Sequence, residues 1–263
     1  MPVILKLLTA AFFTCLSLAA YGEKLRIVTE PWAPYVYEEH GAMHGLDYET
    51  TVIVFQRLGV EVQWQFLPWK RCLAMLDQGH ADGALDIFHS HDRDALLLYP
   101  SEPLSEVEFV MFYANERPHP VQSLDDLRGL TVGTSPGYLY GSPFIDSTEF
   151  NREPAPSHEA NFGKLLLGRI DLLITDRRVG QHLIKALGLE NKVSQAPVVV
   201  SRQQQYLAVR RGAGMDLLVQ RFAAELKRFK QEPAYTQLSA KYGGIQAITA
   251  SGHAVEQQES GAP

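Results

Sequence analysis

The chain has 263 residues, of which 46% are hydrophobic and 21% are charged, and its formal net charge is −6. This is the composition of a globular protein with a sizeable core, and the length suits one large or two modest domains. The acidic balance, with no stretch rich in Lys and Arg, argues against nucleic acid and anionic membrane surfaces as partners.

The N-terminal segment has the pattern of a secretory signal peptide. Lys6 precedes and borders the apolar run "LLTAAFFTCLSLAA", which is too short for a membrane span. The small residues Ala20 and Gly22 favour cleavage after Gly22, and cleavage after Ala20 is the alternative. Cys15 would be removed, so Cys72 would be the only cysteine left and no intrachain disulfide could form. An exported chain without disulfides indicates a bacterial periplasm.

The first half of the mature chain alternates strand and helix signals. Strands are expected at "KLRIV", "VEVQWQF" and "ADGALDIF", and helices at "LDYETTVIVFQRLG" and "WKRCLAMLDQG". Gly59 and Gly79 are expected to end the two helices. This order predicts a parallel sheet with right-handed crossovers.

A short internal repeat relates two parts of the chain. Gly79-x-x-Asp82 follows a predicted helix and precedes an apolar strand, and Gly168-x-x-Asp171 stands in the same setting. Each of these strands then places an acidic residue near its carboxyl end, Asp86 in the first and Asp176 in the second. The repeat indicates two α/β lobes that are built alike.

The second half continues with mixed signals. Ser123 is expected to cap a short helix, "LTVGT" to form a strand, and "SPGYLYG" to form a turn that opens a helix. The apolar stretches "EFVMFYA" (108–114) and "QQYLAVRR" (204–211) are candidates for two crossing hinge strands. The amphipathic segment "MDLLVQRFAAELKRF" is then expected to pack back on the first lobe.

These elements predict an α/β fold with two mixed or parallel sheets joined by the two hinge strands. The predicted boundaries are a signal peptide over residues 1–22, a first lobe over 23–110 plus 209–245, a second lobe over 111–208, and a disordered tail over 246–263, where no periodicity is seen.

The order of these motifs resembles the bacterial extracellular solute-binding proteins of family 3, the periplasmic receptors of amino-acid ABC transporters. The segments that carry the resemblance are "LRIVTEPWAPYVY", "GLDYETTVIVFQRLGVEVQWQFLPW", "LDQGHADGALDIFHSHDR", "YPSEPL", "SLDDLRGLTVGTSPG" and "LLLGRIDLLITD". The resemblance covers the chain from the first strand to Gly244. It implies a two-lobed type II periplasmic-binding fold that closes on its ligand like a hinge.

The resemblance assigns a carboxylate grip to Ser90 and Arg93. The family has a Thr-x-x-Arg motif here, and Ser90 keeps the hydroxyl. A guanidinium offers a planar fork that fits two carboxylate oxygens. The alternative is an exposed arginine at the start of a helix, and His91 and Asp92 depart from the family pattern.

The same resemblance assigns the ammonium of an amino-acid ligand to Asp176, for which a helix N-cap is the alternative role. Ligands of open α/β sheets bind beyond the carboxyl ends of the strands, which is where Asp86 and Asp176 lie. Glu30 stands where some relatives that bind cations have an Asp. Together, Glu30, Asp86 and Asp176 would favour a positively charged ligand, although Asp86 could cap the strand end and Glu30 could face solvent.

Aromatic residues gather after the first strand. Trp32 is the expected lid over the ligand, Tyr35 is a second candidate, and Trp69 at the start of a helix is a candidate wall. Gly137 corresponds to the family turn whose amides meet the ligand carboxylate. Tyr138 replaces a small hydroxyl residue of the family, which predicts a narrowed pocket and a small or flat ligand.

The predicted function is therefore capture of an amino acid or a relative in the periplasm and delivery to an ABC transporter permease, by a monomer without catalytic activity or cofactor. One alternative is an enzyme of the same fold that resembles cyclohexadienyl dehydratases, and another is a sensor that presents its ligand to a chemoreceptor or sensor kinase. The motif H-E-x-x-H is absent from the sequence.

A metal site at His89 and His91 is a further alternative. An H-x-H pair on a strand directs both imidazoles to one face, and Asp92 and Asp94 are close, but a third ligand would have to come from elsewhere. Since nothing else has ligand spacing, the sequence predicts no metal. The direction of the Arg71 side chain, into the cleft or outward, is left open.

Overall fold

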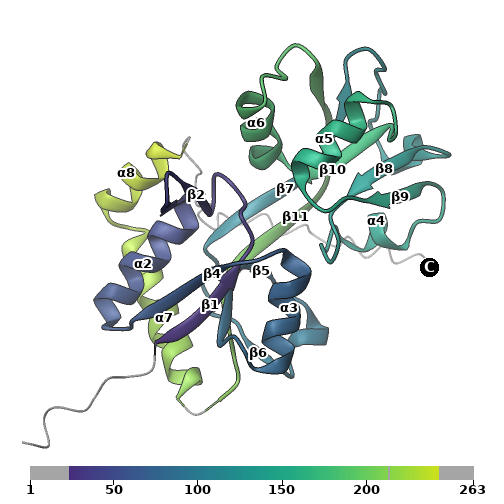
Figure 1. The fold of residues 1–263 in the computed structure, drawn as a ribbon. Coiled ribbons are helices and arrows are strands. Elements are labelled where there is room, and N and C mark those ends of the chain that lie inside the picture. Colours follow the sequence, from purple (N-terminus) through teal and green to yellow (C-terminus); the bar gives the residue numbers. More distant parts are fainter. Residues whose placement is uncertain (1–23, 213, 243–263) are drawn as a thin grey trace, which may run out of the picture.

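The computed structural model describes residues 24–212 and 214–242. Figure 1 shows two groups of elements linked by two long strands, β7 and β11. We call the group around β1, β4 and β5, with α2, α3, α7 and α8, lobe 1. We call the group around β8, β9 and β10, with α4, α5 and α6, lobe 2. The predicted signal peptide and tail lie outside the described residues.

The strands, in chain order, are β1 (Leu25–Thr29), β2 (Tyr37–Glu39), β3 (Ala42–His44), β4 (Val62–Phe66), β5 (Gly83–Phe88), β6 (Leu97–Leu98), β7 (Ser105–Ala114), β8 (Thr131–Thr134), β9 (Asn151–Pro154), β10 (Leu172–Asp176) and β11 (Val193–Arg210).

The α-helices are α2 (Leu46–Leu58), α3 (Trp69–Gln78), α4 (Ser142–Asp146), α5 (His158–Leu166), α6 (Arg177–Ala186), α7 (Met215–Phe229) and α8 (Pro233–Lys241). The short 3₁₀ helices are η1 (His91–Arg93) and η2 (Leu124–Leu127).

Eight strands form one hydrogen-bonded path in the order β4-β1-β5-β11-β7-β10-β8-β9. β6 pairs with β11 beside this path, and β2 and β3 form a separate two-stranded sheet. β1 pairs in parallel with β4 and β5, and β8 pairs in parallel with β9 and β10. β11 and β7 are antiparallel to each other and join the two parallel parts. The predicted hinge strands are thus confirmed, and they link the two predicted sheets into one. The predicted lobe boundaries fall inside β7 and β11.

The aspartates of the Gly-x-x-Asp repeat make the same hydrogen bonds in both lobes. Asp82 accepts the backbone N–H of Arg26 at 2.8 Å, and the N–H of Asp82 donates to the Arg26 carbonyl. In lobe 2, Asp171 accepts the N–H of Thr131 at 2.7 Å and donates its own N–H to the Thr131 carbonyl. Each aspartate therefore ties the loop after a helix to the start of the neighbouring strand.

The predicted helix ends are confirmed. Gly59 and Gly79 close α2 and α3 in the left-handed conformation that glycine adopts without steric cost. Ser123 forms a reciprocal capping box with Asp126 at η2. The amphipathic helix α7 packs on α2 of lobe 1, where the rings of Phe222 and Phe55 lie 5.1 Å apart.

The predicted turn "SPGYLYG" (135–141) leads directly into a helix, since α4 begins at Ser142 with Gly141 as its N-cap. Gly137 is left-handed with φ of 82°, and the Ser135 N–H donates to the Tyr140 hydroxyl at 2.7 Å. Gly137 itself lies within the turn, before the N-cap, so the end of α4 does not present its amides at Gly137.

Two further observations bear on the sequence predictions. Cys72 is buried and free, and burial raises the pKa of its thiol to about 12, so it packs as a small apolar residue. Across residues 24–212 and 214–242, no helix combines the length and the apolar character needed to cross a membrane.

Candidate functional site

Predicted site residues from the two lobes meet at the carboxyl ends of β1 and β10. Glu30 follows the last residue of β1, and Asp176 is the last residue of β10. Each carboxyl group accepts a hydrogen bond from a tyrosine of the opposite lobe. Tyr35 of lobe 1 donates to Asp176 Oδ1 at 3.2 Å, and Tyr138 of lobe 2 donates to Glu30 Oε2 at 2.7 Å. We call these two contacts the tyrosine bridges.

The loop that carries Tyr35 is fixed to the start of α2. The N–H groups of Leu46 and Asp47 donate to the carbonyls of Pro34 and Tyr35 at 3.1 and 3.0 Å. Gly45 is required there, since a Cβ atom at this position would lie 2.1 Å from the Tyr35 carbonyl oxygen. The loop therefore uses orphan donors of a helix end to hold Tyr35 toward lobe 2.

Asp176 is fully buried and has four hydrogen-bond donors. Its Oδ1 accepts the N–H groups of Arg178 and Val179 at 2.9 and 3.0 Å as well as the Tyr35 hydroxyl, and its Oδ2 accepts the N–H of Glu108 at 3.0 Å. The alternative role of helix N-cap is therefore present. Arg178 also donates to the Tyr35 hydroxyl oxygen at 3.1 Å, which completes a network around this carboxyl.

Glu30 links the two lobes through a chain of polar groups. Its Oε1 accepts the N–H of Trp69 at the start of α3, at 3.2 Å. Tyr138 gives its single hydroxyl hydrogen to Glu30, so its oxygen accepts from His158 Nε2 at 3.2 Å. His158 Nδ1 then accepts the Thr175 hydroxyl at 3.4 Å. Burial lowers the pKa of His158 to about 4, so its imidazole is neutral within this series of hydrogen bonds.

Trp32 lies between the two tyrosine bridges. Its ring is 5.4 Å from Tyr35 and 5.9 Å from both Phe88 and Tyr138, measured between centroids. The indole Nε1 is buried without a hydrogen-bond partner. A buried donor without a partner costs free energy that a suitably placed acceptor would recover.

Trp69 and Gly137 face each other across the lobes. A Cβ atom on Gly137 would lie 3.5 Å from Cδ1 of the nearly buried Trp69. The predicted wall and the predicted turn are therefore close neighbours.

Ser90 and Arg93 come together on one turn, as their spacing requires. Ser90 precedes η1, and the Arg93 N–H donates to the Ser90 carbonyl at 2.9 Å. Arg93 is half-buried, and its Nη1 donates to the Phe88 carbonyl at 3.4 Å. Within the described part of the chain Arg93 makes no ion pair, so its guanidinium is available to an anion. Arg71, in contrast, is exposed on α3.

Asp86 makes no hydrogen bond of good geometry to either tyrosine bridge. Between Ala84 and Ile87, β5 has two residues where β11 has one, which is a β-bulge, and Asp86 adopts a positive φ of 59° within it. Its carboxyl is buried beside that of Asp47, and neither oxygen has a hydrogen-bond partner of good geometry. Burial and the negative charge of Asp47 raise the pKa of Asp86 well above its ordinary value.

Burial raises the pKa of both carboxyls of the tyrosine bridges, Glu30 and Asp176. The pKa of Glu30 is raised despite hydrogen bonds from Tyr138 and Trp69, and that of Asp176 despite the N–H donors of Val179 and Glu108. A cation placed between the lobes would reverse this effect, because it favours the ionised carboxylates.

Some residues of this region were not found as site residues from the sequence. Tyr138 was expected only to narrow the pocket, and it instead reaches Glu30 of the other lobe. His158 follows the N-cap Ser157 of α5 and Arg178 follows the N-cap Asp176 of α6, so both have the pattern of ordinary helix starts. Only the packing of the lobes brings them to the interface.

Comparisons with known proteins agree with this architecture. The sequence profile of the bacterial extracellular solute-binding proteins, family 3, matches residues 25–245. The "Probable amino-acid-binding protein YxeM" of Bacillus subtilis is 22% identical over 212 residues, which cover 80% of this chain and 79% of that protein.

Two solved structures have the same fold. A histidine kinase sensor domain with similarity to periplasmic binding proteins superimposes with a TM-score of 0.75 and 20% identity, over 85% of this chain and 97% of that one. The amino acid ABC transporter substrate-binding protein AbpA from Streptococcus pneumoniae, bound to L-arginine, gives a TM-score of 0.72 and 18% identity, over 85% and 96%. Both likenesses support the type II periplasmic-binding fold.

Proposed function

The chain belongs to the bacterial extracellular solute-binding proteins, family 3, and on that premise we propose that it captures an amino acid or a close relative between its two lobes. The observation that carries this proposal is the pair of tyrosine bridges, through which half-buried Glu30 and buried Asp176 each accept a hydrogen bond from the opposite lobe. A ligand ammonium offers the same kind of donor with a positive charge.

In the proposed complex the ligand takes the place of the Tyr138 side chain between the lobes. Its ammonium takes over the hydrogen bond to Glu30 and adds one to Asp176, since an ammonium has three donors. Its carboxylate meets Arg93 and the Ser90 hydroxyl, and Trp32 covers its side chain. Binding in this mode would connect both lobes through one molecule and would couple capture to lobe closure.

The cellular role that fits best is delivery to an ABC transporter permease in the inner membrane by a periplasmic monomer. The predicted signal peptide supports export, and the likeness to a substrate-binding protein of such a transporter supports transport. Because that relative is bound to L-arginine, and because Glu30 and Asp176 are both acidic, L-arginine is the first ligand to try.

A thermal-shift screen tests the proposal. The protein is unfolded and refolded to remove any bound compound and is then mixed with L-arginine, L-lysine, L-histidine, L-glutamine, L-glutamate, putrescine or succinate. A micromolar ligand corresponds to about 8 kcal/mol of binding free energy and stabilises the fold by about 2.7 kcal/mol at a hundredfold excess over Kd. We expect at least one amino acid to raise Tm.

Arg93→Ala and its control Arg71→Ala then test the binding mode. Arg93→Ala is expected to abolish the ligand-dependent rise in Tm, whereas Arg71→Ala should retain it, because Arg71 is exposed on α3. An unchanged response of Arg93→Ala would refute the carboxylate grip. If no amino acid binds but the protein turns over prephenate or arogenate, the enzyme alternative replaces this proposal.

A further inference from the structure

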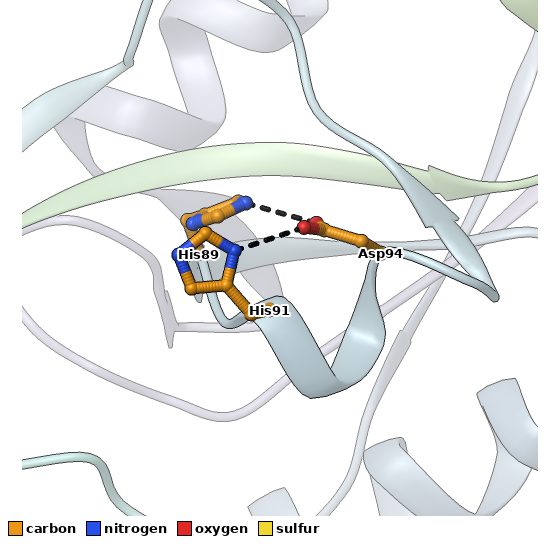
Figure 2. Close-up of side chains that lie close together, drawn as sticks. All are labelled: His89, His91 and Asp94. Atoms are coloured by element: carbon orange, nitrogen blue, oxygen red, sulfur yellow. Dashed lines mark hydrogen bonds and ion pairs between the residues drawn. The ribbon is translucent and has the colours of Figure 1, made fainter.

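Three side chains that can bind a metal converge around η1, beside the predicted carboxylate grip. Figure 2 shows the imidazoles of His89 and His91 directed at the carboxylate of Asp94. His89 Nε2 lies 2.9 Å from Asp94 Oδ1, and His91 Nδ1 lies 3.2 Å from Asp94 Oδ2. The candidate ligand atoms of the three residues all lie within 4.8 Å of one another.

These distances suit a tetrahedral metal ion. Zinc binds histidine nitrogen and carboxylate oxygen at about 2.0–2.2 Å, so neighbouring ligand atoms of a tetrahedral site are about 3.3–3.5 Å apart. The two histidine–carboxylate separations of 2.9 and 3.2 Å need to widen by only a few tenths of an ångström, and they involve the two different oxygens of Asp94. Because the three ligand atoms lie within 4.8 Å of one another, the exposed His91 side chain would turn to bring all three to one ion.

The local backbone holds the three residues in this arrangement. His89 directly follows β5, and η1 turns the chain so that the Asp94 N–H donates to the His91 carbonyl at 3.1 Å. The Asp94 carbonyl in turn accepts Arg211 Nε at 2.8 Å. The ring of Tyr99 packs edge-on against His89, with the centroids 4.8 Å apart. The third ligand, which the sequence pattern alone does not supply, is thus Asp94, brought back by a single 3₁₀ turn.

We propose that His89, His91 and Asp94 bind one divalent late first-row transition ion, of which Zn²⁺ is the representative. Two imidazoles and one carboxylate form a ligand set suited to Zn²⁺, Co²⁺, Ni²⁺ and Cu²⁺ rather than to Mg²⁺ or Ca²⁺. Three protein ligands leave the fourth position open to water or to an external ligand.

The position of the site relates it to the proposed binding of a solute without depending on it. Ser90 and Arg93 belong to the same turn as the three ligands, so an ion would restrain the turn that carries the grip. His89 also lines a polar hollow of ≈ 420 Å³ together with Glu106, Arg202, Gln203, Gln204 and Tyr206, which gives solvent access to this end of the site.

Titration of tag-free, refolded and chelator-treated protein with Zn²⁺ and Co²⁺ tests the proposal. We expect one equivalent of Zn²⁺ to bind by calorimetry, and Co²⁺ to give the strong visible absorption of a tetrahedral complex. Removal of partners in the outer shell of a metal site already costs about 10–100-fold in affinity. His91→Ala and Asp94→Asn should therefore each weaken Zn²⁺ binding at least about tenfold and abolish the Co²⁺ spectrum.

The variants are chosen so that folding does not obscure the result. The His91 side chain is 94% exposed, so its removal leaves the core intact. His80→Ala, at an exposed histidine of lobe 1, is the matched control and should bind Zn²⁺ like the wild type. Absence of Zn²⁺ binding, or binding that His91→Ala or Asp94→Asn leaves unchanged, would overturn the proposal. Because the readout is the metal alone, failure here leaves the proposed amino-acid binding untouched.

Discussion

β5 in lobe 1 and β10 in lobe 2 hold equivalent positions in the sequence repeat, but the aspartates near their carboxyl ends differ in hydrogen bonding. Each strand follows a Gly-x-x-Asp segment whose aspartate ties the sheet together in the same way, and each carries a buried aspartate at or near its end. Asp176 takes four hydrogen bonds at the start of α6. Asp86 sits in a β-bulge beside Asp47 with no donor of good geometry.

The difference shows that a repeated position does not imply a repeated role. At the end of β10 a helix begins at once, and its first N–H groups donate to the Asp176 carboxyl. At the end of β5 the chain bulges and no α-helix follows directly, and the Asp86 carboxyl lies beside another acid, Asp47. Lobe 2 therefore presents a carboxyl with four hydrogen-bond donors, while lobe 1 presents Glu30 and the cation Arg93.

The largest expected effect is that of Asp176→Ala. Loss of this acceptor leaves four buried donors unpaired, including the two that cap α6, so the free energy of unfolding should fall by about 3–5 kcal/mol. Asp176→Asn keeps one acceptor oxygen, so its free energy of unfolding should fall by less than that of Asp176→Ala. Urea denaturation of both, with the exposed Asp125→Ala as control, measures the difference; equal stability of Asp176→Ala and the wild type would refute the network.

Asp86→Asn is expected to raise the free energy of unfolding at high pH, in contrast to Asp176→Ala. The folded-state pKa of Asp86 is raised, so the folded protein holds a proton between pH 3.8 and the raised value that the unfolded chain has released. Stability from this group is therefore present at low pH and is lost as pH rises. Since asparagine carries no charge, the variant should be more stable than the wild type by about 1–3 kcal/mol at pH 8.

The pH dependence supplies the control for that variant. At pH 4 the two proteins should have nearly equal stability, and Asp77→Asn, at an exposed position on α3, should match the wild type at both pH values. The difference in stability between the wild type and Asp86→Asn should grow progressively as pH rises above 3.8 and stop growing once pH passes the raised pKa of Asp86. A loss of stability in Asp86→Asn at pH 8 would mean that Asp86 is ionised and solvated by the protein.

A smaller effect is expected for Tyr138→Phe. This change removes one hydroxyl from the chain Glu30–Tyr138–His158 and leaves the ring in contact with Trp32. Because a single hydroxyl is lost, the free energy of unfolding should fall by about 1 kcal/mol. Denaturant titration measures this change. The control is Tyr113→Phe, at a half-buried tyrosine of β7, which shows how much stability is lost when a tyrosine hydroxyl outside the bridges is removed.

Most of the fold was predictable because hydrophobic periodicity and glycine stops are local signals. The ends of α2 and α3, the hinge strands and the Gly-x-x-Asp repeat were all found in this way. The turn "SPGYLYG" and the helix α4 after it were also predictable, since glycine and proline mark where a regular element begins or ends.

The candidate site was predictable only in part. Ser90 and Arg93 are close neighbours in the sequence, so a turn unites them, and the same turn brings Asp94 back to His89. The tyrosine bridges join residues more than a hundred positions apart, and nothing in the local sequence pairs Tyr35 with Asp176 or Tyr138 with Glu30. The bulge that contains Asp86 depends on the register of β5 with β11, which a strand pattern does not specify.

The central claim is that a ligand and the Tyr138 side chain compete for one place between the lobes. Calorimetric titration of the wild type and of Tyr138→Ser with L-arginine, or with the compound that stabilises the protein most in the thermal-shift screen, tests it directly. We expect tighter binding to Tyr138→Ser, by about tenfold, because one hydrogen bond and the ring contacts of Tyr138 no longer have to be displaced. Equal or weaker binding to Tyr138→Ser would contradict it.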